Sequence, residues 1–89
     1  MTDIVLKVKR SQCKVDILEY LLKGGALSMH LAKALGYHKS TISHNLRELR
    51  KMGLVSFQVP TYKRVTRRDL RNRVYQITFT GRQVWRSLP

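Results

Sequence analysis

The segment KSTISHNLRELRK, residues 39–51, combines an apolar stripe with a cluster of hydrogen-bond donors. At about 100° per residue, Ile42, Leu46 and Leu49 fall within one narrow sector, which predicts a helix packed on a core. The opposite side is polar and cationic and holds Ser40, His44, Arg47 and Lys51, flanked by Lys39 and Ser43. Donors gathered toward the N-terminal half of a helix are typical of a helix that enters the major groove of DNA.

These donors differ in the contacts that they can make. Arg47 can form two hydrogen bonds, to O6 and N7 of a guanine. Ser40 and Ser43 can bond bases or phosphates, and Thr41 can reach a neighbouring phosphate. His44 can donate to a base or contact the backbone. A solvated helix face explains any single serine or lysine equally well, so the prediction depends on the whole group.

A second cluster of cations lies between two predicted strands. Alternating apolar residues predict these strands, one with Val55, Phe57 and Val59 and the other with Tyr75, Ile77 and Phe79. The connecting segment PTYKRVTRRDLRNR makes a long cationic hairpin tip with Lys63, Arg64, Arg67, Arg68, Arg71 and Arg73. Because like charges repel, this run favours contact with phosphates or the minor groove, with a solvated loop as the alternative.

The donor-bearing helix must be supported by the elements before it. One helix is expected from Ser11, a suitable N-cap, to Lys23, where two glycines follow. It is apolar on two faces, one with Val15, Leu18 and Leu22, the other with Cys13, Ile17 and Tyr20. Two such faces need two partners, the chain's own core and, on our interpretation, a second subunit.

A second helix, MHLAKAL, is predicted to be capped by Ser28 and to end at Gly36. A third begins at His38 or Lys39 and runs to Met52, before Gly53. Two short helices joined by a tight turn that contains glycine form a helix-turn-helix.

The two ends of the chain are less clearly patterned. Alternation over residues 4–9 predicts a short strand, with a helical lead-in as the alternative. Near the other end, Thr80 and Gly81 are expected to open a short helix whose apolar residues close the core or meet a partner: Val84, Trp85 and Leu88.

Length and charge bound the class of protein. A chain of 89 residues suits one domain, residues 1–89. Its 18 Lys and Arg against 5 Asp and Glu give a net charge of +13, which attracts polyanions. No apolar run approaches the roughly 20 residues that span a bilayer, and DIVLKVK is too short and charged for a signal peptide. We expect a cytoplasmic protein without a membrane partner.

Catalytic and metal chemistry are not expected. His30, His38 and His44 do not share a helix face, and C-x-x-C spacing is absent, so no metal or other cofactor is predicted. The five carboxylates do not suggest an acid–base pair, and Glu48 is expected to pair with a nearby helix cation. Cys13 is interpreted as a small half-buried residue, with an intersubunit disulfide as the alternative.

Two motifs resemble a known family. The segment LAKALGYHKSTISHNLRELRKMGLV resembles the helix-turn-helix of winged-helix transcription regulators of the MarR and ArsR type. The segment RVYQITFTGRQVW is similar to the Y-x-L-T-x-x-G segment that follows their wing. The resemblance covers most of the chain after Ser11 and is specific for the fold, but many small archaeal and bacterial regulators share it.

The resemblance implies an α+β winged helix-turn-helix, with a three-helix core, a two-stranded β-wing and a short C-terminal helix. Recognition-helix positions would be Lys39, Ser40, Thr41, Ser43, His44 and Arg47, and the arginines from Arg64 to Arg73 would lie in the wing. Two features depart from the family pattern. His38 occupies a cap position where Ser or Thr is common, and the long terminal dimerisation helices of full MarR proteins are missing.

The resemblance also implies a homodimer on a pseudo-palindromic site. The leftover apolar surface suggests its interface: Val5, Cys13, Ile17, Tyr20, Trp85 and Leu88. Two recognition helices would then lie about 34 Å apart and read half-sites about 10 bp apart.

The leading hypothesis is a sequence-specific regulator that binds double-stranded DNA. One alternative is a winged-helix protein-interaction module whose basic wing meets an acidic partner, although such a surface would be expected to carry more apolar anchors. Another is a nonspecific nucleic-acid or chromatin binder, which would lose affinity equally to any competing duplex.

Overall fold

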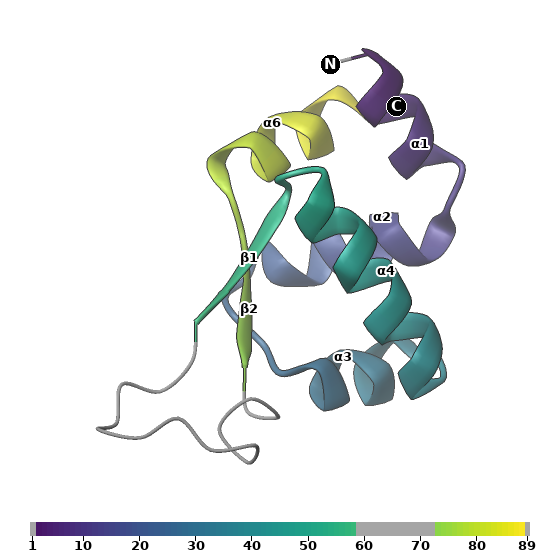
Figure 1. The fold of residues 1–89 in the computed structure, drawn as a ribbon, viewed down its shortest axis with the longest axis vertical. Helices are drawn as coiled ribbons and strands as arrows, with labels where there is room; N and C mark the ends of the chain where they lie inside the picture. The colour runs from purple at the N-terminus through teal and green to yellow at the C-terminus, as the bar shows by residue number, and fades with distance from the viewer. Residues whose placement is uncertain (1, 59–72, 89) are drawn as a thin grey trace.

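Helix α2 (Gln12–Leu21) is the central element of the computed structural model, which describes residues 2–58 and 73–88. It contacts α1, α3, α4, α6 and the strand β2. Figure 1 shows α1 and α6 together at one end of the molecule, α3 at the other end, and the hairpin along one side. The bounds of these elements are α1 (Thr2–Lys9), α3 (Ser28–Leu35), α4 (Lys39–Lys51), β1 (Val55–Gln58), β2 (Val74–Ile77) and α6 (Phe79–Ser87).

Both apolar faces of α2 pack within the chain, whereas the prediction left one of them for a second subunit. Ser11 caps the helix as predicted, because its Oγ accepts a hydrogen bond from the backbone N–H of Lys14 at 3.4 Å. Leu22, however, is 37% exposed, whereas Ile17 is completely buried. Since α2 is covered on several sides by its own chain, both of its apolar faces are used within the fold.

The helix-turn-helix consists of α3 and α4. Gly36 has φ +75°, a left-handed conformation that glycine adopts without a Cβ clash, and it ends α3 as predicted. The prediction that Ser28 caps α3 is wrong, because Leu27 holds the cap position and Ser28 is the first helical residue. Leu27 offers no polar side-chain atom, and its cap carries no side-chain hydrogen bond.

The hairpin pairs β1 with β2 in antiparallel register, with Val55 opposite Ile77 and Phe57 opposite Tyr75. An additional bridge joins the segment after α2 to β2, through Ala26 N–H to the Tyr75 carbonyl at 3.0 Å and the reverse bond at 2.8 Å. The strand β2 is thereby attached to the segment between α2 and α3. The predicted strand residue Val59 and the hairpin tip lie outside the described residues.

The structure differs from the prediction at both ends of the chain. Residues 4–9 belong to the helix α1, so the predicted strand is wrong and the helical alternative is confirmed. Val8 is completely buried and Ile4, one helical turn earlier, packs against the same core.

At the other end, α6 begins at Phe79, which was predicted to lie in a strand and is 75% exposed. Its cap is Thr78, not Thr80. The Thr78 Oγ1 accepts a hydrogen bond from Gly81 N–H at 2.9 Å and donates to the Gly53 carbonyl at 2.7 Å. Val84 of α6 is completely buried, so this helix closes the core, as predicted.

The core is one cluster of buried side chains contributed by every helix and by β1. Its largest fully buried members include Ile17, Leu18, Leu21, Leu31, Ile42, Leu46, Leu49, Leu54, Val55 and Val84. Among the helices that the structure describes, none has the length and apolarity needed to cross a bilayer.

Candidate nucleic-acid interface

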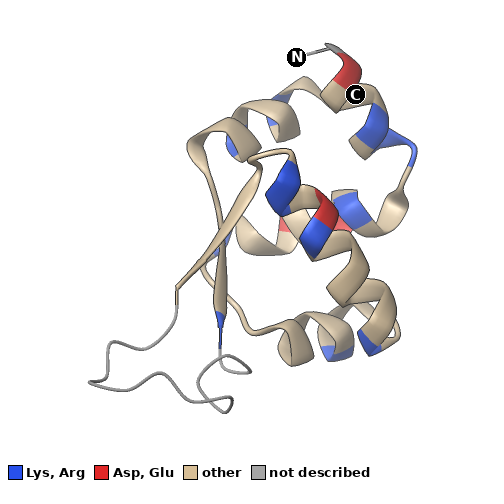
Figure 2. Cartoon of the chain, viewed as in Figure 1, with Lys and Arg blue, Asp and Glu red and all other residues tan. Residues whose placement is uncertain are grey.

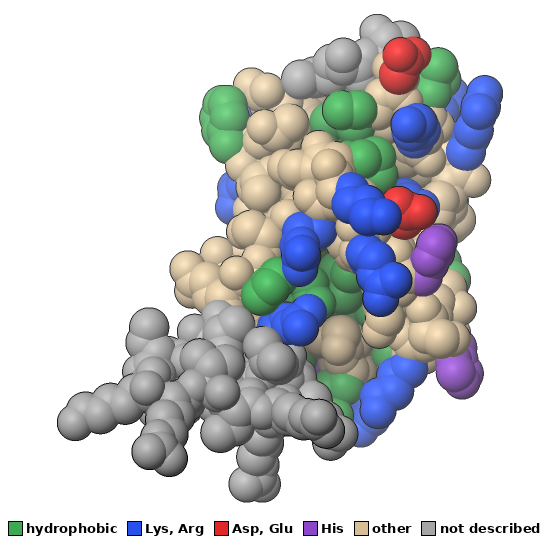
Figure 3. All heavy atoms as spheres, in the orientation of Figure 1, with side chains coloured by type: hydrophobic (Ala, Val, Ile, Leu, Met, Phe, Trp, Pro, Cys, Tyr) green, Lys and Arg blue, Asp and Glu red, His purple; other side chains and the backbone are tan. Residues whose placement is uncertain are grey.

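Helix α4 presents its polar face to solvent. Ile42, Leu46 and Leu49 are each no more than 1% exposed and anchor the opposite face in the core. The predicted contact residues are all exposed: Lys39, Ser40, Thr41, Ser43, His44 and Arg47. Figure 2 shows the basic residues along α4, and Figure 3 shows Lys and Arg side chains gathered over the same face. The predicted orientation of the helix is therefore confirmed.

The first turn of α4 is capped by a histidine. The His38 Nδ1 accepts a hydrogen bond from the backbone N–H of Ser40 at 3.2 Å and lies 2.8 Å from the Ser40 Oγ. His38 therefore caps the helix in place of the Ser or Thr that is common at this position, because its Nδ1 accepts a hydrogen bond from the otherwise unpaired Ser40 N–H. The same contact orients the Ser40 hydroxyl at the exposed start of the helix.

A buried amide ties α4 to α2. Asn45 is only 7% exposed and is a polar residue on the core side of α4. Its Oδ1 accepts from the Lys14 Nζ at 2.8 Å, and its Nδ2 donates to the Thr41 carbonyl at 2.9 Å. Ser11 Oγ lies 3.5 Å from the same Oδ1. Sequence reasoning missed this residue, although its spacing, three positions after Ile42 and four before Leu49, was a signal for it.

A second polar contact ties the helix-turn-helix turn to α2. The Tyr37 hydroxyl donates a hydrogen bond to Asp16 Oδ2 at 2.7 Å. This bond to a carboxylate stabilises the neutral phenol and raises the pKa of Tyr37 from 10.0 to about 12. Gln12 Nε2 donates to the other carboxylate oxygen of Asp16 at 2.8 Å, so the carboxylate is held from two sides.

The structure also places two residues for which the sequence predicted a role, Glu48 and Cys13. Glu48 lies 3.8 Å from the His44 Nε2, one helical turn away, so its partner on α4 is a histidine. Cys13 was expected to be half-buried but is 7% exposed and lies in the core. Burial raises the pKa of the Cys13 thiol, and the nearby Asp16 carboxylate raises it further.

The hairpin contributes an arginine and two aromatic rings beside α4. Phe57 and Tyr75 pair across the strands with ring centroids 5.8 Å apart. The guanidinium carbons of Arg50 and Arg73 each lie 4.7 Å from the centre of the Phe57 ring. Sequence reasoning did not select Arg50, Phe57 or Tyr75, because their proximity depends on the pairing of the strands and their packing on α4.

Of the cations predicted for the wing, only Arg73 belongs to the described residues. It is half-buried at the start of β2. The other five lie outside the part of the chain that the structure describes: Lys63, Arg64, Arg67, Arg68 and Arg71.

The residues predicted for a dimer interface divide into two groups. Ile17 and Cys13 lie in the core of the chain itself, so the expectation that they form an outward face is wrong. The other four pack against the core while keeping part of their surface exposed: Val5, Tyr20, Trp85 and Leu88.

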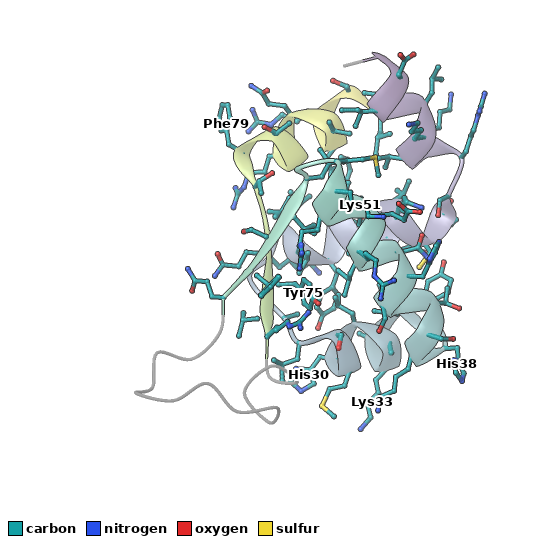
Figure 4. All side chains as sticks on the ribbon, in the orientation of Figure 1. His30, Lys33, His38, Lys51, Tyr75 and Phe79 are labelled. Carbon is teal, nitrogen blue, oxygen red and sulfur yellow. The ribbon has the colours of Figure 1, made fainter. Side chains whose placement is uncertain are left out.

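The histidines are dispersed. His30 lies on α3, His38 before α4 and His44 on α4, and Figure 4 shows the first two at separate places on the molecule. Within residues 2–58 and 73–88, no three His, Cys, Asp or Glu side chains gather as metal ligands.

A protein-family comparison identifies this arrangement. The model of the arsR family of bacterial regulatory proteins matches residues 11–56, which include α2, the helix-turn-helix and the start of β1. The chain belongs to the ArsR family. It is accordingly a winged helix-turn-helix transcription regulator of a class that binds DNA, and its family consists of regulators rather than enzymes.

Solved structures support the same fold. A MarR-family transcriptional regulator from Enterococcus faecalis is 21% identical with a TM-score of 0.78, over 97% of this chain and 74% of that chain. The transcriptional repressor BigR from Xylella fastidiosa is 20% identical with a TM-score of 0.72, over 93% of this chain and 75% of that chain. No curated protein sequence gave a significant match.

A third similar structure comes from Mycobacterium bovis. It is a homodimeric winged helix-turn-helix DNA-binding domain, described as a possible ArsR-family regulator. It is 28% identical with a TM-score of 0.65, over 93% of this chain and 67% of that chain. The predicted fold class, a winged helix-turn-helix, is confirmed by these structures and by the family.

Proposed function

We propose that this ArsR-family regulator recognises a specific sequence in double-stranded DNA by placing the N-terminal half of α4 in the major groove. One observation carries the proposal. The apolar side of α4 is buried in the core, while the six predicted contact residues on its other side are all exposed. An exposed helix face of small donors and an arginine suits base edges and phosphates.

Individual contacts follow from side-chain chemistry. Arg47 is proposed to read a guanine with two hydrogen bonds, a contact worth about 1–3 kcal/mol of discrimination against the wrong base. Ser40, Ser43 and His44 are proposed to contact bases or the backbone, and Lys39 and Thr41 the flanking phosphates. The wing, including the segment outside the described residues, is proposed to bind the DNA backbone or minor groove.

We further propose that the protein acts as a homodimer, in the cytoplasm, on a site with two half-sites about 10 bp apart. The homodimeric domain from Mycobacterium bovis supports this assembly. The partly exposed apolar residues of α1, α2 and α6 suit the interface: Val5, Tyr20, Trp85 and Leu88. Sedimentation at micromolar concentration that detected only a 10.4 kDa species would contradict the dimer.

Selection of bound fragments from a random duplex pool tests both specificity and symmetry. An inverted repeat is the expected product. Recovery of fragments without a shared sequence would contradict specific recognition and favour a nonspecific binder, which the net charge of +13 would also permit.

With a selected site in hand, Arg47→Ala tests the assignment of the helix. This variant should lose about 1–3 kcal/mol of discrimination at one base pair, because it removes the guanine contact. Arg68→Ala, in the wing, should weaken binding to all duplexes by similar factors. Equal losses on selected and random DNA for Arg47→Ala would count against base reading by α4.

A further inference from the structure

A basic cleft lies between the C-terminal half of α4 and the strand β2. It encloses about 510 Å³ and is lined by Ser43, Leu46, Arg47, Arg50, Lys51, Arg73 and Tyr75. Figure 4 shows Tyr75 between the hairpin and α4, and Figure 3 shows basic side chains surrounding a hydrophobic patch in the same region. Of these lining residues, only Ser43 and Arg47 belong to the α4 residues that are proposed to contact DNA.

The charges of this cleft are unbalanced. Four of its lining side chains are cations, and none is a carboxylate. Glu48, the acidic residue of α4, lies within reach of His44 and lines a different cleft, beside Lys7 and Lys14. Cations held together without a counter-charge repel one another, and an anion in the cleft would relieve that repulsion.

The cations are positioned by an aromatic ring. The guanidinium groups of Arg50 and Arg73 lie at the same distance, 4.7 Å, from the centre of the Phe57 ring. The two guanidinium carbons are therefore separated by no more than twice that distance. A ring that holds two arginine side chains restricts their rotamers, so less conformational entropy is lost when they bind a common ligand.

Arg73 also has an unused donor. Its Nε is buried and has no hydrogen-bond partner among the described residues. A buried donor without a partner costs free energy, and a bound ion is one of the ordinary explanations for it. The guanidinium of arginine matches the oxygen atoms of a phosphate through paired N–H donors.

We propose that this cleft is a phosphate site in which Arg50 and Arg73, held by Phe57, bind one phosphate group, with Arg47 and Lys51 at its margin. The group is either a phosphodiester of the DNA backbone or a free phosphate. The first source deepens the proposed DNA-binding function and rests on it, whereas the second does not. Binding of one phosphate by both arginines, rather than of two phosphates separately, is the distinguishing claim.

The DNA arm measures how the affinity for a short random-sequence duplex depends on salt. Arg50→Gln, Arg73→Gln and the double variant should each lower the log–log slope by about 0.9, the value for one phosphate. Arg82→Gln removes an exposed arginine of α6 outside the cleft and should leave the slope unchanged. A double variant that loses about twice the slope of either single variant would overturn the shared site.

Phe57→Leu separates positioning from charge. It keeps the net charge at +13 but removes the ring that both guanidinium groups contact, so it should lower the slope as Arg73→Gln does. If only total charge mattered, Phe57→Leu would bind like the parent protein, and the proposal would fail. Thermal melting of each variant shows whether the variant is still folded. Arg73→Lys is a milder second variant, because it keeps the positive charge but loses the Nε–H.

The free-phosphate arm titrates inorganic phosphate into the full chain and follows the Arg73 Nε–Hε signal by NMR, with chloride as the control anion. A saturable shift that Arg50→Gln weakens supports the site. A shift together with unchanged DNA slopes assigns the site to free phosphate. No shift together with unchanged slopes would overturn the proposal, even if selected DNA were bound specifically. Failure of specific binding alone would contradict only the proposed function.

Discussion

Removing the buried amide of Asn45 should loosen the attachment of the recognition helix to α2. Asn45→Ala deletes the acceptor of the Lys14 ammonium at 2.8 Å and the donor to the Thr41 carbonyl at 2.9 Å. A hydrogen bond to a charged group contributes about 1.5–3 kcal/mol and a neutral one about 0.5–1.5 kcal/mol. The Ser11 contact, at 3.5 Å, is too long to add much.

The loss of stability should be smaller than the sum of these two contributions, because Lys14 is half-buried and its ammonium regains water when its partner is lost. We therefore expect Asn45→Ala to lower the free energy of unfolding by about 2 kcal/mol. For a domain of this size the melting temperature should fall by roughly 10 °C.

Urea and thermal unfolding, followed by circular dichroism at neutral pH, measure this change. Ser43→Ala is the matched control on the same helix, because Ser43 is exposed. Its effect should stay within about 0.5 kcal/mol. A loss for Asn45→Ala no larger than that of the control would refute the view that this amide holds α4 in place.

Two further predictions concern the elements around the site. Gly81→Ala should destabilise the fold by about 3 kcal/mol, although helix propensity alone would predict a gain of up to about 1 kcal/mol. A Cβ at Gly81 would strike the Leu54 carbonyl and lie 2.8 Å from Ile77 Cγ1, whereas Gly36→Ala meets no atom within 4 Å and should cost only about 1 kcal/mol for its positive φ. Chemical denaturation compares the two, and a stabilised Gly81→Ala would contradict the packing argument. The Tyr37 phenol should stabilise the fold fully below pH 10, and this contribution should disappear as the pH rises toward about 12, because the folded pKa is raised by the bond to Asp16. Tyr37→Phe should lack this component, so a difference in melting temperature between the two proteins that stays constant over this range would exclude it.

Local patterns were sufficient for the helix-turn-helix. The spacing of Ile42, Leu46 and Leu49 predicted which side of α4 is buried, and the positive φ angles of Gly36 and Gly53 agree with the predicted ends of α3 and α4. These features depend on residues a few positions apart, so the periodicity of one helix and the steric freedom of glycine account for them. The exposure of the six predicted contact residues follows from the same periodicity.

Short or doubly apolar segments were less predictable. The alternation over residues 4–9 fitted a strand, but this segment packs on the helices α2 and α6, and burial of Val8 against the core favours a helix. Ile17 was assigned to an outer face because a helix pattern cannot say how many neighbours a helix has. Once α2 is surrounded by its own chain, that face is internal.

The sequence by itself determined that a basic, donor-bearing helix follows a tight glycine turn and keeps its apolar side inward. Only the tertiary structure decided that Asn45 is buried beside Lys14, 31 positions away, and that Arg50 and Arg73 share the ring of Phe57. The physical reason is that amphipathic periodicity acts within one helix, whereas a buried amide or a stacked guanidinium depends on contacts between elements. Those contacts exist only after the elements have packed.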